Sequence, residues 1–175
     1  MNRRKIKILV DSLLQQYGLN DIPIDVEKFA KLSGAEIKRE DFNDVLSGFA
    51  FQKLGSKYIG INASEGHERQ RFTIAHELGH LFLHKQSPVN YDQGVMMLRD
   101  GHASEGTDIK EIEANRFAAE LLMPEESLQA DIAKKGQIDL INDTDEAQLL
   151  ISELADKYQV SRQAMSIRLA TLYFS

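Results

Sequence analysis

A His-Glu-Leu-Gly-His segment at residues 76–80 constrains this chain more than any other feature. It lies within a helical pattern, and in a helix residues i and i+4 share one face, one turn apart. His76 and His80 can therefore bind one metal ion, while Glu77, about 100° further round the helix, flanks that ion without binding it. Two imidazoles, an adjacent carboxylate and a bound water are the groups that a zinc hydrolase uses.

The residues around this motif favour a metal site over an ordinary surface helix. Apolar residues at helical spacing predict one buried side, and a second stripe beside it contains Thr73, His76, His80 and His84. A surface helix normally carries Lys and Glu in such a stripe. The sequence around Ser64 predicts the start of this helix, because a serine commonly caps a helix N-terminus.

A zinc hydrolase usually has three protein ligands and one open position for water. His84 is an obvious candidate for the third, but it lies about 12 Å along the helix axis from His76. One ion, about 2.1 Å from each ligand, does not span that distance. His84 is therefore expected to have a structural role or to lie near the substrate, and the third ligand to come from another element.

A second segment, residues 110–124, is rich in helix-forming residues and offers two acids as the third ligand. Glu111 is favoured, because the neighbours on its helix face are small or apolar and allow close packing against the first helix. Glu113 remains open as the alternative. Asn115, one turn after Glu111, is placed to orient a ligating histidine through its other ring nitrogen.

Residues 71–84 and 113–124, taken together, resemble the ImmA/IrrE family of metallo-endopeptidases. The resemblance implies a gluzincin-like zinc site, a cytoplasmic location and, as substrate, a protein that is often a helix-turn-helix transcriptional repressor. We therefore predict an endopeptidase with one Zn²⁺ per chain, Mn²⁺ being possible with the same ligand types. A metal-bound water would attack the peptide carbonyl, with Glu77 as general base. The alternative is a non-catalytic metal-binding sensor or protein-interaction module.

The rest of the pattern predicts an α+β fold with a small antiparallel sheet beside the zinc-binding helices. Helices are expected at residues 3–17 and 26–32, a strand at 35–39, and a hairpin at 47–62. Residues 145–158 and 162–173 predict helix-turn-helix-like C-terminal helices. The chain thus divides into a peptidase domain at residues 1–140 and a C-terminal segment at 141–175 packed on it.

Two other segments are candidates for substrate contact. Phe49, Ala50 and Phe51 form a candidate edge strand that pairs with substrate, although core strand residues would give the same pattern. Residues 85–109 form a long connector between the two ligand-bearing helices, and loops of this length are often functional. Within it, Tyr91 and His102 are candidate oxyanion-stabilising residues.

Composition excludes several other classes of protein. The chain has no cysteine, which excludes disulfides and thiolate zinc sites. Its net charge is −6, and residues 141–175 carry five acids against three bases. This balance opposes direct DNA binding, which needs a basic surface. No apolar stretch is long enough to span a membrane, and no signal peptide is evident, so the expected location is the cytoplasm.

Overall fold

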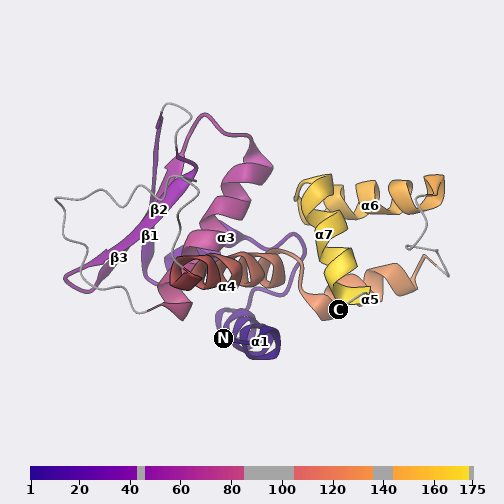
Figure 1. The fold of residues 1–175 in the computed structure, drawn as a ribbon, viewed down its shortest axis with the longest axis horizontal. Coiled ribbons are helices and arrows are strands. Elements are labelled where there is room, and N and C mark those ends of the chain that lie inside the picture. Colours follow the sequence, from indigo (N-terminus) through magenta and orange to yellow (C-terminus); the bar gives the residue numbers. More distant parts are fainter. Residues whose placement is uncertain (43–45, 85–104, 136–143, 174–175) are drawn as a thin grey trace.

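This computed structural model describes residues 1–42, 46–84, 105–135 and 144–173. These residues form an α+β fold, as predicted, with the sheet on one side of α3 and α5–α7 at the end of the molecule away from the sheet (Figure 1). The elements are α1 (Arg3–Tyr17), α2 (Val26–Leu32), β1 (Ala35–Glu40), β2 (Gly48–Lys53), β3 (Ser56–Asn62), α3 (His67–Leu83), α4 (Glu105–Leu122), α5 (Glu125–Ala133), α6 (Asp145–Tyr158) and α7 (Arg162–Tyr173).

The two N-terminal helices have the predicted bounds because capping residues end them. The Asn2 side chain accepts a hydrogen bond from Lys5 N at 3.0 Å, and Gly18 ends α1 in the left-handed conformation. The Asp25 side chain accepts one from Lys28 N at 2.9 Å and caps α2. Such caps satisfy the backbone groups that the terminal turns of a helix leave unpaired.

The sheet is mixed, so the prediction of an antiparallel sheet is wrong in this respect. Strands β2 and β3 form the predicted antiparallel hairpin, whereas β1 pairs with β3 in parallel, and the order is β1-β3-β2. Ile59 and Ile61 of β3 are fully buried, which suits the central strand of the three. Strand β2 occupies one edge of β3, so β1 pairs along the other edge. The chain reverses direction between β1 and β2 and again between β2 and β3, so β1 and β3 run in the same direction.

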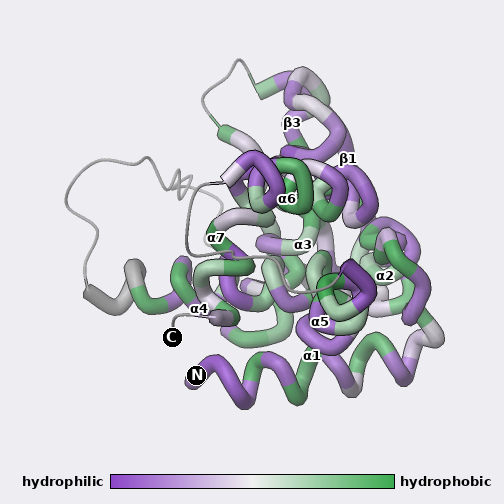
Figure 2. Tube along the Cα trace, turned by 90° about the vertical axis from the view of Figure 1, so that its right-hand side faces the viewer, coloured by the Kyte–Doolittle hydropathy of each residue, from purple (hydrophilic) through white to green (hydrophobic). Residues whose placement is uncertain are grey.

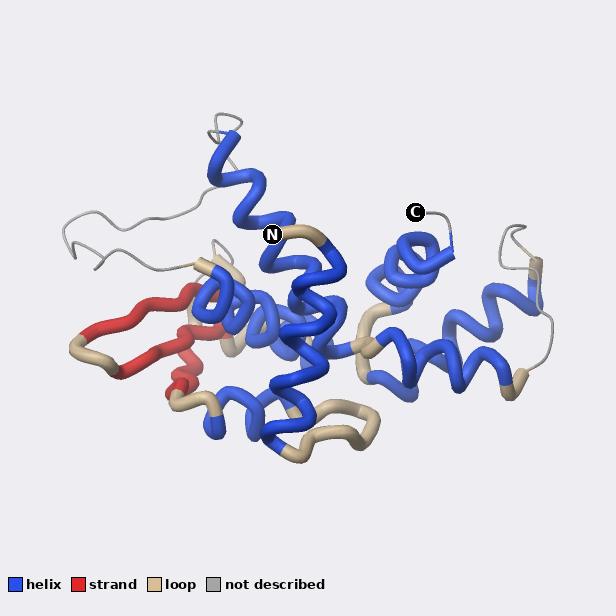
Figure 3. Tube along the Cα trace, turned by 90° about the horizontal axis from the view of Figure 1, so that it is seen from below, coloured by secondary structure: helices blue, strands red, loops and turns tan. Residues whose placement is uncertain are grey.

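The core lies between α3, α4, α1 and one face of the sheet. Its fully buried members include Ile59 of β3, Leu78 of α3, Phe117 of α4 and Val10 of α1. Helix α1 lies along the lower side of this core (Figures 1 and 3) and alternates polar with apolar residues along its length (Figure 2). No helix among the described residues is both long and apolar enough to cross a membrane.

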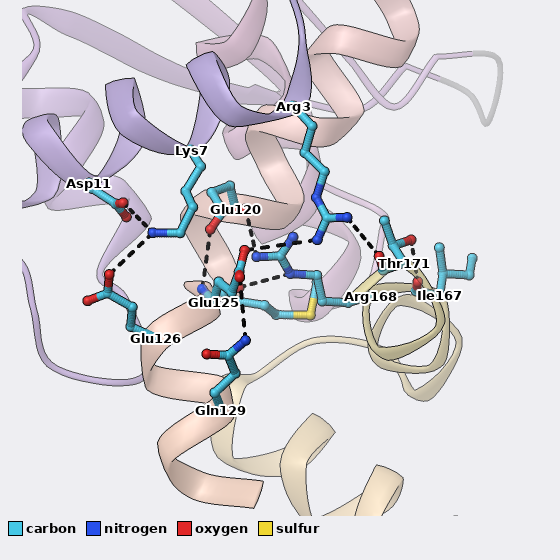
Figure 4. Close-up of polar contacts among 11 residues, drawn as sticks. Arg3, Lys7, Asp11, Glu120, Glu125, Glu126, Gln129, Ile167, Arg168 and Thr171 are labelled. Carbon is cyan, nitrogen blue, oxygen red and sulfur yellow. Dashed lines mark hydrogen bonds and ion pairs between the residues drawn. The ribbon is translucent and has the colours of Figure 1, made fainter. Parts of the chain in front are cut away.

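A buried ion pair joins the C-terminal helices to α4. Arg168 of α7 donates to Glu120 Oε2 at 2.7 Å and to the Met123 carbonyl at 3.1 Å, and both charged side chains are less than 5% exposed. Arg3 of α1 also donates to the carbonyl of Thr171 in α7 at 2.8 Å (Figure 4). Because breaking a buried pair leaves one charge uncompensated, this junction holds α7 firmly against α4.

The C-terminal helices lie where the sequence predicts them, whereas α4 begins earlier. Helices α6 and α7 occupy the predicted residues, and the Ser161 side chain accepts a hydrogen bond from Ala164 N at the start of α7. Their helix-turn-helix character remains a prediction. Helix α4 begins at Glu105 rather than near Lys110, so residues 105–109 do not belong to the connector. The predicted domain boundary between residues 140 and 141 lies outside the described residues. The same is true of the two candidate oxyanion-stabilising residues, Tyr91 and His102.

The carboxylate of Asp131 links α5 to α6. It accepts hydrogen bonds from Lys157 Nζ at 2.6 Å, from the Tyr158 hydroxyl at 2.9 Å and from Lys134 Nζ at 3.0 Å. Burial disfavours the ionised form, but these hydrogen bonds outweigh it and lower the pKa of Asp131. A carboxyl whose pKa is lower in the folded chain than in the unfolded chain stabilises the fold. This stabilisation is fully present at pH values above the pKa of the unfolded chain, and it is lost as the pH falls through the pKa of the folded chain.

We expect Asp131→Asn to lower the free energy of unfolding by about 1–2 kcal/mol at pH 7. The difference from the parent should shrink as pH falls below about 4, because the carboxyl of the unfolded parent becomes protonated there and that of the folded parent at still lower pH. Urea unfolding at pH 7 and at about pH 3 measures both values. The exposed Asp156→Asn variant is the charge-matched control. An equal loss at the two pH values would contradict the assigned role of the carboxylate.

Candidate metal centre

Helix α3, which carries the motif, begins at His67 with Gly66 at its N-cap and no side-chain cap. The prediction that Ser64 starts the helix is therefore wrong. The Ser64 hydroxyl donates instead to Asn62 Oδ1 at 2.8 Å, in the turn that follows β3. Because Asn62 is itself buried, the serine satisfies a polar group at the end of the strand and is not available to cap α3.

The two motif histidines lie one above the other on α3. Their Nε2 atoms are 3.0 Å apart and their ring centroids 4.7 Å apart, so both rings turn the same nitrogen toward one point. Each side chain is only 16% exposed. Glu77 differs from both, since it is 8% exposed although it carries a carboxyl group. Glutamate is almost never buried without a specific reason.

A glycine allows α4 to reach this face of α3. A Cβ atom on Gly79 would lie 2.9 Å from Ala114 Cα and 3.1 Å from Phe117 Cβ. Real side chains do not make contacts this close, so any larger residue at position 79 would push the two helices apart. The two helices thus meet almost backbone to backbone at Gly79 and Ala114. This contact brings Glu111, one turn before Ala114, to the histidines.

The structure brings His76, His80 and Glu111 together, and one ligand atom from each lies within 4.8 Å of the others. Glu111 Oε2 is 3.1 Å from His76 Nε2, and Glu111 Oε1 is 3.1 Å from His80 Nε2. Ligands of a tetrahedral zinc ion, each about 2.0–2.1 Å from the metal, are roughly 3.4 Å apart. The three side chains therefore need to separate by only a few tenths of an ångström to hold such an ion.

Asn115 supplies the orienting contact that its sequence position suggests. Its Oδ1 atom is 2.9 Å from His76 Nδ1. Because an amide oxygen only accepts hydrogen bonds, Nδ1 carries the hydrogen and Nε2 of the neutral ring keeps its lone pair. That lone pair faces the Glu111 carboxylate and the second imidazole. A cation between these donors would offset their mutual repulsion, so the donor set fits a metal ion such as Zn²⁺.

The other candidate acid and the third histidine of the stripe lie apart from this cluster. Glu113 forms an ion pair with the amino group of Met1, and its Oε2 lies 3.8 Å from His84 Nδ1. His84 Nε2 donates to the carbonyl of Lys110 at 3.1 Å. His84 therefore holds α4 against the end of α3, immediately before Glu111. His84 therefore has the structural role that is expected of a histidine too far along the helix to share a metal ion with His76.

The environment of Glu77 suits a general base. Burial raises the pKa of this carboxyl above its ordinary value, with a smaller opposing effect from the charges of His76 and His80. A carboxylate with a raised pKa accepts protons more readily than an exposed glutamate does. Glu111 behaves in the opposite way: when the two histidines are protonated, their hydrogen bonds to its carboxylate hold its pKa well below the usual range. Of the two acids, Glu111 is therefore the more readily ionised and Glu77 the more readily protonated.

We expect Asn115→Ala to weaken zinc binding about 10- to 100-fold, because His76 loses the contact that fixes its ring and tautomer. Asn115→Asp should restore binding, since a carboxylate also accepts from Nδ1. Competition with a chromophoric chelator measures the zinc affinity of both variants. If Asn115→Ala bound zinc as tightly as the parent, the contact would have no orienting role.

Arg71 is a structural contributor that sequence reasoning missed. It is 8% exposed, and it donates to the Gln159 carbonyl at 3.1 Å and to the Ile24 carbonyl at 3.0 Å. It thereby ties the motif helix to the turn between α6 and α7 and to the connector before α2. Nothing in the local sequence signals this, because an arginine near a helix start is usually solvated.

The fold is thus an α+β domain in which two histidines and a glutamate from adjacent helices converge into a candidate metal site. Residues 29–170 match the IrrE N-terminal-like domain of the peptidase M78 family. The chain therefore belongs to the ImmA/IrrE family of metallopeptidases.

Individual relatives agree with this assignment. The chain is 27% identical over 120 residues to uncharacterized immunity region protein 2 of Bacillus phage phi105. The aligned segment covers 69% of this chain and 69% of the phage protein. It is 32% identical over 81 residues to metallopeptidase ImmA of Bacillus subtilis (strain 168), covering 46% of this chain and 45% of that protein. A Mycobacterium tuberculosis transcriptional regulator shares the fold, with a TM-score of 0.65 and 15% identity. The match spans 97% of this chain and about half of the regulator, 47%.

Proposed function

We propose that this protein is a zinc-dependent endopeptidase that cleaves a regulatory protein. The observation that carries the proposal is the convergence of His76, His80 and Glu111 beside a buried carboxylate, Glu77. A purely structural zinc site closes its fourth position with another protein ligand and has no use for a general base. The described residues offer three ligands, which leaves a position for water and substrate.

In the proposed reaction, His76, His80 and Glu111 hold the ion and Asn115 keeps His76 in the ligating tautomer. When bound, Zn²⁺ polarises the scissile carbonyl and lowers the pKa of a bound water toward about 7. The Glu77 carboxylate accepts the proton of the attacking water and then passes it to the leaving amine. Burial raises the pKa of Glu77, which favours its acceptance of the proton in the first of these steps.

The substrate we propose is a helix-turn-helix transcriptional repressor. The resemblance to the ImmA/IrrE family and the immunity-region name of the phage relative support this class. Strand β2 lies at one edge of the sheet and packs against α3. This position beside the motif helix is the one expected of a strand that binds substrate. A substrate strand added there would bind through its backbone, which accepts many side chains. Phe49, Ala50 and Phe51 form this edge.

Cleavage of purified helix-turn-helix repressors tests the proposal, beginning with any encoded near this gene. Zinc-loaded protein is incubated with each repressor, and the products are identified by intact-mass spectrometry. One defined cut that a chelator abolishes and added zinc restores is the expected result. If one metal ion binds per chain and none of these repressors nor any general protein substrate is cut, the sensor alternative replaces the peptidase.

A further inference from the structure

The face of the sheet turned away from the core carries a row of aromatic rings. Side chains alternate along each strand, so Phe49, Phe51 and Tyr58 lie opposite the buried Ile59 and Ile61. The Phe49 and Phe51 rings stack with centroids 6.1 Å apart, and Phe51 stacks on Tyr58 at 5.0 Å. These rings belong to the sheet surface and not to the metal centre.

This aromatic surface is hollowed. Phe42, which follows β1, lies 5.6 Å from the Phe49 ring at a 45° tilt, so the two rings meet at an angle. Together with Phe51, Tyr58 and two charged residues of β1 they line a cavity of about 290 Å³. A Cβ atom on Gly60 would lie 2.5 Å from the Phe49 ring, so the absence of a side chain at Gly60 lets this ring pack directly against β3.

The charges at the cavity favour a cationic occupant. Lys38 Nζ lies 5.6 Å from the centre of the Tyr58 ring and pairs with Glu36 at 3.7 Å, so one cation–π contact already forms on this surface and the lysine charge is compensated. Glu40 also lines the cavity, and its carboxylate has no ion-pair partner among the described residues. Aromatic faces and an unpaired carboxylate complement the same positive charge.

We propose that this cavity docks an arginine side chain from an extended segment of a basic protein partner. A guanidinium group stacks on aromatic faces and forms a forked pair with a carboxylate, so it matches both Phe49 and Glu40. A DNA-binding regulator is rich in such side chains, and the net charge of −6 on this protein also attracts it. Only the naming of this partner as the substrate rests on the proposed peptidase function.

The docking test uses ¹⁵N-labelled Glu77→Gln protein, so that no peptide is consumed. The probe is the blocked peptide Gly-Ser-Leu-Arg-Ser-Leu-Arg-Ser-Gly, compared with a twin in which citrulline replaces each arginine. Citrulline keeps the shape of arginine and removes its charge. We expect chemical-shift changes at the amides of Phe49, Phe51, Tyr58 and Gly60, and binding of the citrulline twin that is about two- to fivefold weaker.

Two variants separate the charge from the rings. Glu40→Gln and Phe49→Leu should each weaken binding of the arginine peptide about two- to fivefold, since one loses the carboxylate and the other the π face. Glu68→Gln, an equal loss of charge on an exposed turn of α3, should leave it unchanged. Thermal unfolding checks that every variant is folded.

Equal binding of the two peptides, or shifts that map to the motif helix, would overturn the proposal. Stronger perturbation of the same amides by an oligo(dT) strand would make the cavity a nucleic-acid surface instead. Shifts that depend on protein concentration without peptide would indicate a second copy of the chain. A positive result without any repressor cleavage would retain the docking site and reject the peptidase function alone.

Discussion

Glu77→Gln protein is expected to bind one zinc ion per chain and to lose turnover by roughly 10²- to 10⁴-fold. The substitution keeps the size of the side chain and removes its ability to accept a proton. Glu77 is not among the three convergent ligands, so the metal should remain. Metal content by mass spectrometry and kcat/KM on the cleaved repressor, or on a peptide that spans its scissile bond, measure the two effects separately.

The control for this variant is Glu68→Gln, which changes the same residue type in the first turn of the same helix. It should keep both metal and turnover. Because Glu77→Gln replaces a buried carboxylate with a neutral amide, this variant should also be at least as stable as the parent. Zinc-loaded Glu77→Gln protein that cleaves at the parental rate would remove Glu77 from the reaction. Loss of the metal together with activity would leave the general-base role unsupported.

Glu111→Gln is expected to weaken zinc binding by about 10²- to 10⁴-fold. This estimate gives the third ligand about a third of the ~10–16 kcal/mol with which structural zinc sites bind the ion. His80→Ala should have a comparable effect, since it removes one of the two imidazoles. In the parent, saturating zinc should raise the melting temperature, because the ion cross-links α3 to α4 and binds only the folded chain. Both variants should lose this increase.

Glu113→Gln is the matched control and decides between the two acids. It lies two residues further along α4, and its carboxylate faces Met1 and His84 rather than the cluster. The variant should bind zinc with nearly parental affinity and keep the zinc-dependent rise in melting temperature. If Glu113→Gln lost the metal while Glu111→Gln kept it, the ligand assignment would be reversed.

Much of the candidate site could be predicted from local sequence, because its essential spacings lie within single helices. The i, i+4 relation of His76 and His80 follows from helical geometry wherever the segment is helical. The same relation between Glu111 and Asn115 places both side chains on one face of α4. The helix caps at Asn2 and Asp25 are equally local, and for this reason the helix bounds near them were predictable.

The contacts that assemble these parts depend on segments far apart in the chain. Periodicity does not indicate that β1 pairs with β3 in parallel, and for this reason the predicted antiparallel sheet was wrong. It also does not reveal that Arg71 holds α3 to the turn before α7, because burial of an arginine depends on distant carbonyl groups. The starts of α3 and α4 were misplaced for a related reason, since propensity is weak at helix ends.

Local sequence is enough to predict which residues share a helix face and where most of the helices and strands form. That Glu111 rather than Glu113 lies beside His76 and His80 follows from the packing of α3 on α4. That choice depends on the close approach of α3 and α4 at Gly79 and Ala114. Local spacing follows from the repeat of the backbone, whereas the distance and rotation between two helices follow from how all their side chains pack.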